Sequence, residues 1–244
     1  MFLTQFRINT ARSGGRRLLG SPHLMHGAVN MAFPESPPRD GQNPRVLWRV
    51  DQGHDRRALL FIVSPTRPDL THLVEQAGWP MTDEPRWQTF DYATFLHALK
   101  PGDAWSFRLT ANPVHNIRLP TDPPDARSKR TAHRTPRHQL RWLLERQEKS
   151  GFEVLRKSPE QRMLEFGDEH EIILRDALPL QFRRAPGVPT KNDVRFTKVT
   201  YDGRLRVTDA DSFRRTLTHG LGKAKAYGCG LMTLAPLVLR GGEQ

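Results

Sequence analysis

The sequence predicts an α+β protein of two tandem βαββαβ units, the ferredoxin-like order. Strand-like and helix-like patterns follow one another in this order twice along the chain. The length of 244 residues suits two small domains, and an apolar share of 36% is enough for two modest cores. We therefore expect an N-terminal domain at residues 1–98 and a C-terminal domain at residues 99–244.

The first unit begins with a strand at 2–8, because FLTQFRI alternates apolar and polar residues with a period of two. Helical sequence follows from about Arg12. Two β-rich runs joined by a turn at 51–55 then predict a hairpin, and a short helix and a fourth strand complete the unit. These later elements are expected at 46–50, 58–63, 70–76 and 86–92.

The second unit begins with a strand at 105–110, followed by a Pro-rich basic segment and a helix at 138–149. A helix at 209–219 leads into a glycine-rich stretch and a last strand at 231–237. Between the two helices, alternating or β-rich runs predict strands at 152–155, 171–174, 180–184, 194–201 and 205–207.

Charge indicates the class of partner. Lys and Arg number 38 against 26 Asp and Glu, a formal net charge of +12 that favours a polyanion. Residues 1–103 hold 12 basic and 10 acidic side chains, which leaves 26 and 16 for the rest. No apolar run is long enough to span a membrane, and residues 1–9 lack a signal-peptide core. The single cysteine, Cys229, excludes an internal disulfide, so we expect a reducing cytoplasm.

The segment 21–30, SPHLMHGAVN, is the best candidate for chemistry. Ser21 can cap a helix that has Pro22 at its first position. His23 and His26 lie three residues apart on the face opposite the apolar stripe, so both should be accessible near a helix N-terminus that favours phosphate. Two imidazoles beside a phosphate suit acid–base cleavage of RNA. The alternative is a pair of ordinary surface histidines.

Metal chemistry has less support in the sequence. The two histidines have no HExxH pattern and no nearby cysteine or carboxylate to complete a zinc site. A dense acidic cluster at 165–171 could serve a two-metal nuclease, although a charge run at the start of a strand is usually a solvated turn. We expect no metal and no small-molecule cofactor.

Two basic segments and the glycine-rich stretch could contact RNA. Arg127, Lys129, Arg130, Arg134 and Arg137 lie in the Pro-rich connector and could follow a phosphate backbone without a fixed structure. Arg183, Arg184 and Lys191 lie at the predicted tip of a hairpin that could clamp one end of an RNA stem. The alternative for each cluster is a surface that only keeps the protein soluble.

Residues 220–230 contain two Gly-x-Gly pairs around a short basic segment. Glycine allows close backbone approach and positive φ, so the loop could offer amide groups and the ammonium groups of Lys223 and Lys225 to an anion. In the alternative interpretation the glycines only end a helix and begin a strand. The glycines concerned are Gly220, Gly222, Gly228 and Gly230.

Five segments, in this order along nearly the whole chain, resemble the CasE family, the CRISPR repeat endoribonucleases of the type I-E Cascade complex. They are MFLTQFRIN, SPHLMHGAV, WSFRLTANP, KRTAHRTPRHQLRWLLERQEKSGF and GLGKAKAYGCGLMTLAP. The resemblance implies tandem ferredoxin-like (RRM-like, RAMP) domains. It also implies metal-independent cleavage on the 3′ side of the repeat stem, a 2′,3′-cyclic phosphate product, and a protein that stays bound to the crRNA among other Cascade subunits.

The same resemblance assigns candidate residues. The family's catalytic histidine falls on His26, and its helper, commonly a tyrosine, falls on His23. Positions that are often basic in relatives are Gly27 and Met31 here, so phosphate contacts must come from elsewhere. The expected RNA-binding residues are Ser21, Lys129, Arg130, Arg183, Arg184, Lys191, Gly220, Gly222, Lys223, Lys225, Gly228 and Gly230. A non-catalytic RNA-binding subunit of the same fold is the alternative.

Overall fold

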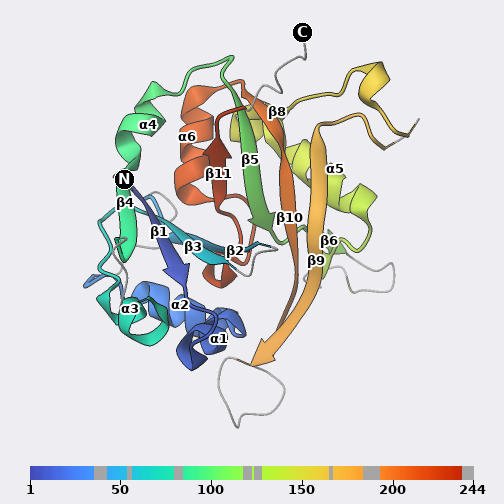
Figure 1. Cartoon of the computed structure of the whole chain (residues 1–244). Helices are drawn as coiled ribbons and strands as arrows, with labels where there is room; N and C mark the ends of the chain where they lie inside the picture. Colours follow the sequence, from blue (N-terminus) through green and yellow to red (C-terminus); the bar gives the residue numbers. More distant parts are fainter. Residues whose placement is uncertain are drawn as a thin grey trace.

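The computed structural model describes most of the chain as two antiparallel sheets with helices packed against them (Figure 1). No helix among the described residues is long and apolar enough to cross a membrane. The described residues are 1–35, 43–53, 57–79, 85–117, 123, 128–164, 167–183 and 193–237.

The first sheet has the strand order β2-β3-β1-β4. Read from the other edge this is 4-1-3-2, so the predicted ferredoxin-like unit is confirmed. The central strand β1 pairs antiparallel with β3 and β4, and β2 pairs with β3 from Leu47↔Val63 to Gln52↔Ala58. Its elements are β1 (Phe2–Ile8), α1 (Ser13–Leu19), α2 (Pro22–Asn30), β2 (Leu47–Gln52), β3 (Ala58–Ser64), α3 (Thr71–Ala77) and β4 (Trp87–Asp91).

Two features of this unit differ from the sequence prediction. The helical segment is divided at Gly20 and Ser21 into α1 and α2, because Ser21 has extended backbone angles and caps a new helix. A further helix, α4 (Tyr92–Ala98), follows β4 directly. The side chain of Asp91 begins it by accepting a hydrogen bond from the Ala93 amide at 3.0 Å.

The second sheet repeats the topology with the order β11-β5-β10-β8, and β9 also pairs with β10. The helices α5 and α6 occupy the two crossover positions, as predicted. Its elements are β5 (Ala104–Ala111), β6 (Val114–Ile117), β7 (Lys129–Ala132), α5 (Pro136–Gln147), η1 (Glu148–Ser150), β8 (Phe152–Val154), η2 (Pro159–Gln161), β9 (Ile172–Arg183), β10 (Asp193–Val207), α6 (Ala210–His219), η3 (Lys225–Tyr227) and β11 (Met232–Ala235).

Some predicted boundaries in this unit are wrong. The strands expected at 171–174 and 180–184 form one strand, β9, and those at 194–201 and 205–207 form one strand, β10. Long antiparallel pairing between them overrides the breaks that Pro179 and Gly203 suggest. The basic connector is also more ordered than expected, because Lys129–Ala132 pairs with Val114–Ile117 as a small separate sheet.

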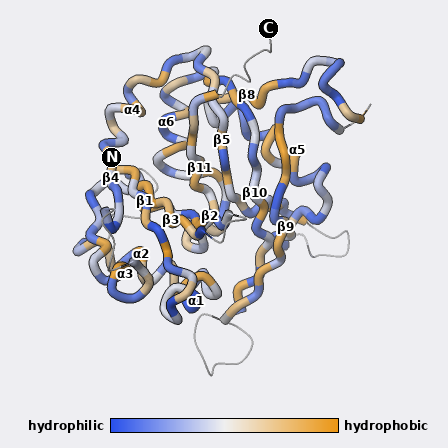
Figure 2. The backbone as a smooth tube through the Cα atoms, viewed as in Figure 1, coloured by the Kyte–Doolittle hydropathy of each residue, from blue (hydrophilic) through white to orange (hydrophobic). Residues whose placement is uncertain are grey.

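Two hydrophobic clusters hold the fold together. One lies between the first sheet and helices α1–α3. The other centres on the second sheet and its helices, and it also includes Leu47 and Val63 from the first sheet. The two units are therefore joined by a packed interface. Hydrophobic residues continue along the far end of β9 and β10 (Figure 2).

Candidate active site

The helix α2 places both predicted catalytic histidines at one edge of the first unit. Ser21 is its N-cap, with the side-chain oxygen accepting a hydrogen bond from the Leu24 amide at 3.3 Å, and Pro22 occupies the first turn. Met25, Ala28 and Val29 are buried against the core. Because His23 and His26 lie off this face, both remain partly exposed. The predicted helix start and the predicted faces are confirmed.

His26 is held by contacts from two parts of the chain. The Asn30 amide, one turn later on the same helix, lies 3.2 Å from His26 Nε2. Because an amide NH₂ group can only donate, Nε2 is the acceptor in this contact. The Tyr227 ring stands edge-on to the imidazole, with the ring centroids 6.4 Å apart and the planes at 69°. The site therefore combines α2 with the C-terminal glycine-rich loop.

The glycine-rich loop packs against strand β2 of the first unit. All four of its glycines have positive φ, between 75° and 92°. A Cβ on Gly220 would come within 2.8 Å of Leu47, and a Cβ on Gly228 within 2.7 Å of the Trp48 ring. Gly220 does end α6, as the simpler interpretation held. The glycines also allow the loop to approach β2 closely enough to carry Tyr227 to His26.

Three cations gather on and beside this loop. Burial lowers the pKa of Lys225, and the nearby charges of Arg45 and Lys223 lower it further. Arg45 is tied to the end of α6 by its backbone amide, which donates to the Thr218 carbonyl at 3.2 Å. Among the described residues no carboxylate forms an ion pair with any of the three. An uncompensated positive cluster of this kind suits an anionic ligand.

The end of the β9–β10 hairpin reaches the same place. Tyr227 packs between Phe182 of β9, at a centroid distance of 4.9 Å, and Phe196 of β10, at 5.8 Å. The backbone of Arg183 directly follows Phe182 and pairs with Asp193. Arg184 and Lys191 lie outside the described residues, as does the side chain of Arg183. The roles predicted for these three residues stay predictions.

Lys129 and Arg130 occupy a different part of the molecule. Both are exposed on β7, whose partner β6 lies beside α5, across the molecule from α2 (Figure 1). Close to them three imidazoles form a stack, with centroid distances of 4.3 Å from His115 to His133 and 5.9 Å from His133 to His138. Those predicted RNA-binding residues that the structure describes therefore fall into two groups.

The acidic cluster does not form a metal site in the part of the chain that the structure describes. Asp168 pairs with Lys157, Glu171 pairs with Arg204 at 3.0 Å, and Glu169 accepts a hydrogen bond from the Gly167 amide at 3.0 Å. No group of three or more potential ligands gathers among the described residues. These carboxylates are engaged in local contacts around a turn, whereas Glu165 lies outside the described residues.

A cavity of about 770 Å³ lies between β2 and the β9–β10 hairpin, bordered by Tyr227 and Gly228. Its walls combine apolar side chains with charged ones, including Arg108 and Arg175, which both pair with Asp202. Neither His23 nor His26 lines it. The cavity is thus a neighbour of the histidine site and does not contain it.

Sequence reasoning missed two residues of this site. Tyr227 lies inside the glycine-rich motif, in which only the glycines and lysines were assigned a role from the sequence. Arg45 follows Pro44 as a single basic residue ahead of β2, with no cluster in the sequence to mark it. Both become visible only when the second unit packs on the first.

The protein thus combines tandem ferredoxin-like units with a histidine-bearing helix that faces a glycine-rich loop. A family model described as "CRISPR associated protein" matches residues 1–236. The chain belongs to this family of CRISPR-associated proteins, and the resemblance found in the sequence is confirmed.

Two named relatives are similar to this chain over nearly its whole length. The CRISPR-associated endoribonuclease Cse3 of Thermus thermophilus is 31% identical over 237 residues, covering 97% of this chain and 100% of the relative. The structure of Thermus thermophilus Cse3 bound to an RNA representing a pre-cleavage complex has a TM-score of 0.71 and 29% identity, over 96% of this chain and 98% of that one. Cas6e of Escherichia coli K-12, at 21% identity and a TM-score of 0.62 over 97% and 100% of the two chains, shares the fold.

Proposed function

We propose that this protein is a metal-independent endoribonuclease that binds the stem-loop of a CRISPR repeat and cleaves precursor crRNA at the 3′ base of the stem. The observation that carries the proposal is the position of His26, with Nε2 facing Asn30 and the ring beside Tyr227 of the glycine-rich loop. The full-length similarity to an endoribonuclease supports it.

In the proposed reaction the 2′-OH attacks the adjacent phosphorus and expels the 5′-oxygen of the next nucleotide, giving a 2′,3′-cyclic phosphate and a 5′-OH. His26 accepts the 2′-OH proton through Nε2 once the RNA displaces the Asn30 amide. His23, one turn before His26 on the same helix side, protonates the leaving oxygen. Lys225, Lys223 and Arg45 stabilise the negative charge that grows on the phosphorane.

The two groups of basic residues then bind different parts of the RNA. Ser21, at the N-terminus of α2, and the loop 220–230 lie beside the scissile phosphate. The hairpin end with Arg183, Arg184 and Lys191 lies next to it, and Lys129 and Arg130 hold a more distant part of the stem. Residues 1–98 supply the histidines and residues 99–244 supply most of the binding surface. After cleavage the protein keeps the hairpin in the cytoplasm as a subunit of a Cascade complex.

A binding subunit without catalysis is the competing function, because the same charges and loop would serve it. Cleavage of the cognate repeat hairpin in EDTA, by wild type beside His26→Ala, separates the two. We expect wild type to cut once at the 3′ base of the stem, and His26→Ala to bind with similar affinity while cutting at least about 100-fold more slowly. Binding by both proteins with no cleavage, with or without metal, would establish the binding subunit instead.

A further inference from the structure

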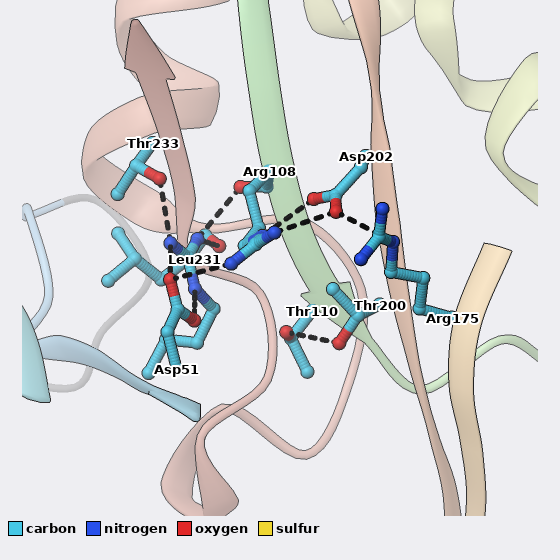
Figure 3. A network of polar contacts seen from close by, with 9 residues as sticks. Asp51, Arg108, Thr110, Arg175, Thr200, Asp202, Leu231 and Thr233 are labelled. Carbon is cyan, nitrogen blue, oxygen red and sulfur yellow. Dashed lines mark hydrogen bonds and ion pairs between the residues drawn. The ribbon is translucent and has the colours of Figure 1, made fainter. Parts of the chain in front are cut away.

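Arg49 of strand β2 is one of the largest fully buried side chains in the described part of the protein, with only 1% of its surface exposed. All five of its N–H donors are used. Nε and Nη2 donate to the two carboxylate oxygens of Asp51 at 2.7 and 2.9 Å. Nη1 donates to the carbonyls of Arg108 at 2.8 Å and Leu231 at 3.1 Å, and Nη2 also donates to Thr233 Oγ1 at 2.7 Å. Three of these five acceptors belong to the second unit (Figure 3).

The position of Arg49 in β2 gives these bonds their importance. The two residues before it, Leu47 and Trp48, are the side chains against which Gly220 and Gly228 pack. Arg49 itself binds the carbonyl of Leu231, the residue that follows the last glycine. Three successive residues of β2 therefore contact the first glycine of the loop, Gly228 near its end, and the residue that follows it.

Arg49 belongs to a chain of ion pairs that crosses the second sheet. Asp51 also lies 3.5 Å from Arg108, which binds Asp202 with two hydrogen bonds of 2.6 and 2.7 Å. Arg175 of β9 completes the chain at 3.3 Å from Asp202 (Figure 3). The network links β2 to strands β5, β10 and β9, so the buried arginine is fixed from both units.

We propose that Arg49 is a positioning residue for catalysis, which holds the glycine-rich loop so that Tyr227 faces His26. This proposal rests on the proposed function, because it assigns Arg49 a role at that site. Arg49 touches neither the histidines nor the expected RNA path. Its effect is transmitted through the Leu231 carbonyl to a loop whose glycines permit movement as soon as the anchor is lost.

The substitution Arg49→Lys tests the proposal, because lysine keeps the charge but offers three donors from one point in place of a five-donor fork. Arg214→Lys is the matched control. Arg214 of α6 also joins the two units, donating to the carbonyls of Leu96 and Leu99 at 2.7 Å each. None of the side-chain hydrogen bonds of Arg214 among the described residues reaches the glycine-rich loop.

The reactivity of a cysteine in the loop can report on whether the loop stays closed. Cys229 is the single cysteine of the chain and is fully buried between Gly228 and Gly230, and burial raises the pKa of its thiol to about 12. Its reaction with a small disulfide reagent under native conditions therefore measures opening of the loop. We expect Arg49→Lys to raise this rate by about tenfold or more, and Arg214→Lys to leave it near the wild-type rate.

The second readout is single-turnover cleavage at saturating enzyme, with hairpin affinity measured in parallel. Arg49→Lys should lower the cleavage rate by about 10- to 100-fold and change affinity by less than about threefold, because misplacement of a loop affects the bound reaction most. Arg214→Lys should cleave at the wild-type rate.

Wild-type thiol reactivity in Arg49→Lys, or equal effects of the two substitutions on thiol reactivity and cleavage, would overturn the proposal. The thiol measurement needs no RNA. If wild type fails to cleave at all, the proposed function is wrong while the thiol rates still decide whether Arg49 anchors the loop.

Discussion

Replacing Gly228 by alanine tests how the glycine-rich loop is seated. Gly228 has φ +77°, and a Cβ there would lie 2.7 Å from Cζ3 of Trp48, which is itself buried in the first unit. The left-handed backbone alone costs a residue with a Cβ about 1–2 kcal/mol. Forcing the added methyl group against a packed ring costs about 1–3 kcal/mol more. We therefore expect Gly228→Ala to lower the free energy of unfolding by about 2–5 kcal/mol.

Two other glycines provide matched controls. Gly102 has φ +93° but nothing within 4 Å of an added Cβ, so Gly102→Ala should show only the backbone term, about 1–2 kcal/mol. Gly27 lies inside α2 with open space around it, so Gly27→Ala should stabilise the protein by about 0.5–1 kcal/mol.

Urea unfolding of the four proteins, followed by tryptophan fluorescence, gives the free energies from the midpoints and slopes. From the most to the least stable, the order should be Gly27→Ala, wild type, Gly102→Ala and Gly228→Ala. Equal losses for Gly102→Ala and Gly228→Ala would refute the close packing of the loop on Trp48, and with it the physical reason given for the glycines.

Three further predictions follow from the structure. Met31 lies five residues after His26 and is 67% exposed, so Met31→Lys should fit without loss of packing. In a filter-binding assay the substitution should tighten hairpin binding by about fivefold, or ~1 kcal/mol. Unchanged affinity would place the RNA away from the end of α2. Arg45→Gln should reduce the slope of log affinity against log salt by about 1 if Arg45 contacts a phosphate, whereas an unchanged slope would remove it from the interface. Burial, and next the charges of His115 and His138, lower the pKa of His133, so the unfolded chain binds more protons as the pH falls through the ordinary histidine range. The stabilisation from neutral His133 is present above that range and lost below it, and His133→Gln should therefore show a smaller loss of unfolding free energy than wild type between about pH 7.5 and pH 5.5.

Local patterns were sufficient for much of the fold. The alternation in residues 2–8 and the Ser21-Pro22 helix start depend on neighbouring residues, and both were predicted correctly. The single strands β9 and β10 were predicted as four pieces, because Pro179 and Gly203 look like breaks until the partner strand is in place. The helix α4 was missed because it begins directly at the end of a strand, where Asp91 serves as both its cap and the last strand residue.

The geometry of the candidate site was predictable within one segment and not where two segments meet. The histidines of α2 were found from their spacing on one helix. The contact of Tyr227 with His26 joins residues about 200 positions apart, and no local pattern encodes it. The buried Arg49 looked like an ordinary strand residue, since its five partners come together only after the two sheets pack.

Locating the scissile phosphate on the protein is the most direct test of the proposed site. A repeat hairpin with one photoreactive 4-thiouridine at the cleavage position would be bound to His26→Ala, irradiated, and the cross-linked peptides identified by mass spectrometry. We expect cross-links to peptides that contain residues 21–31 and 223–231. Cross-links confined to peptides of β6, β7 and α5 would contradict the site at His26 and place the cleavage position on the other side of the molecule.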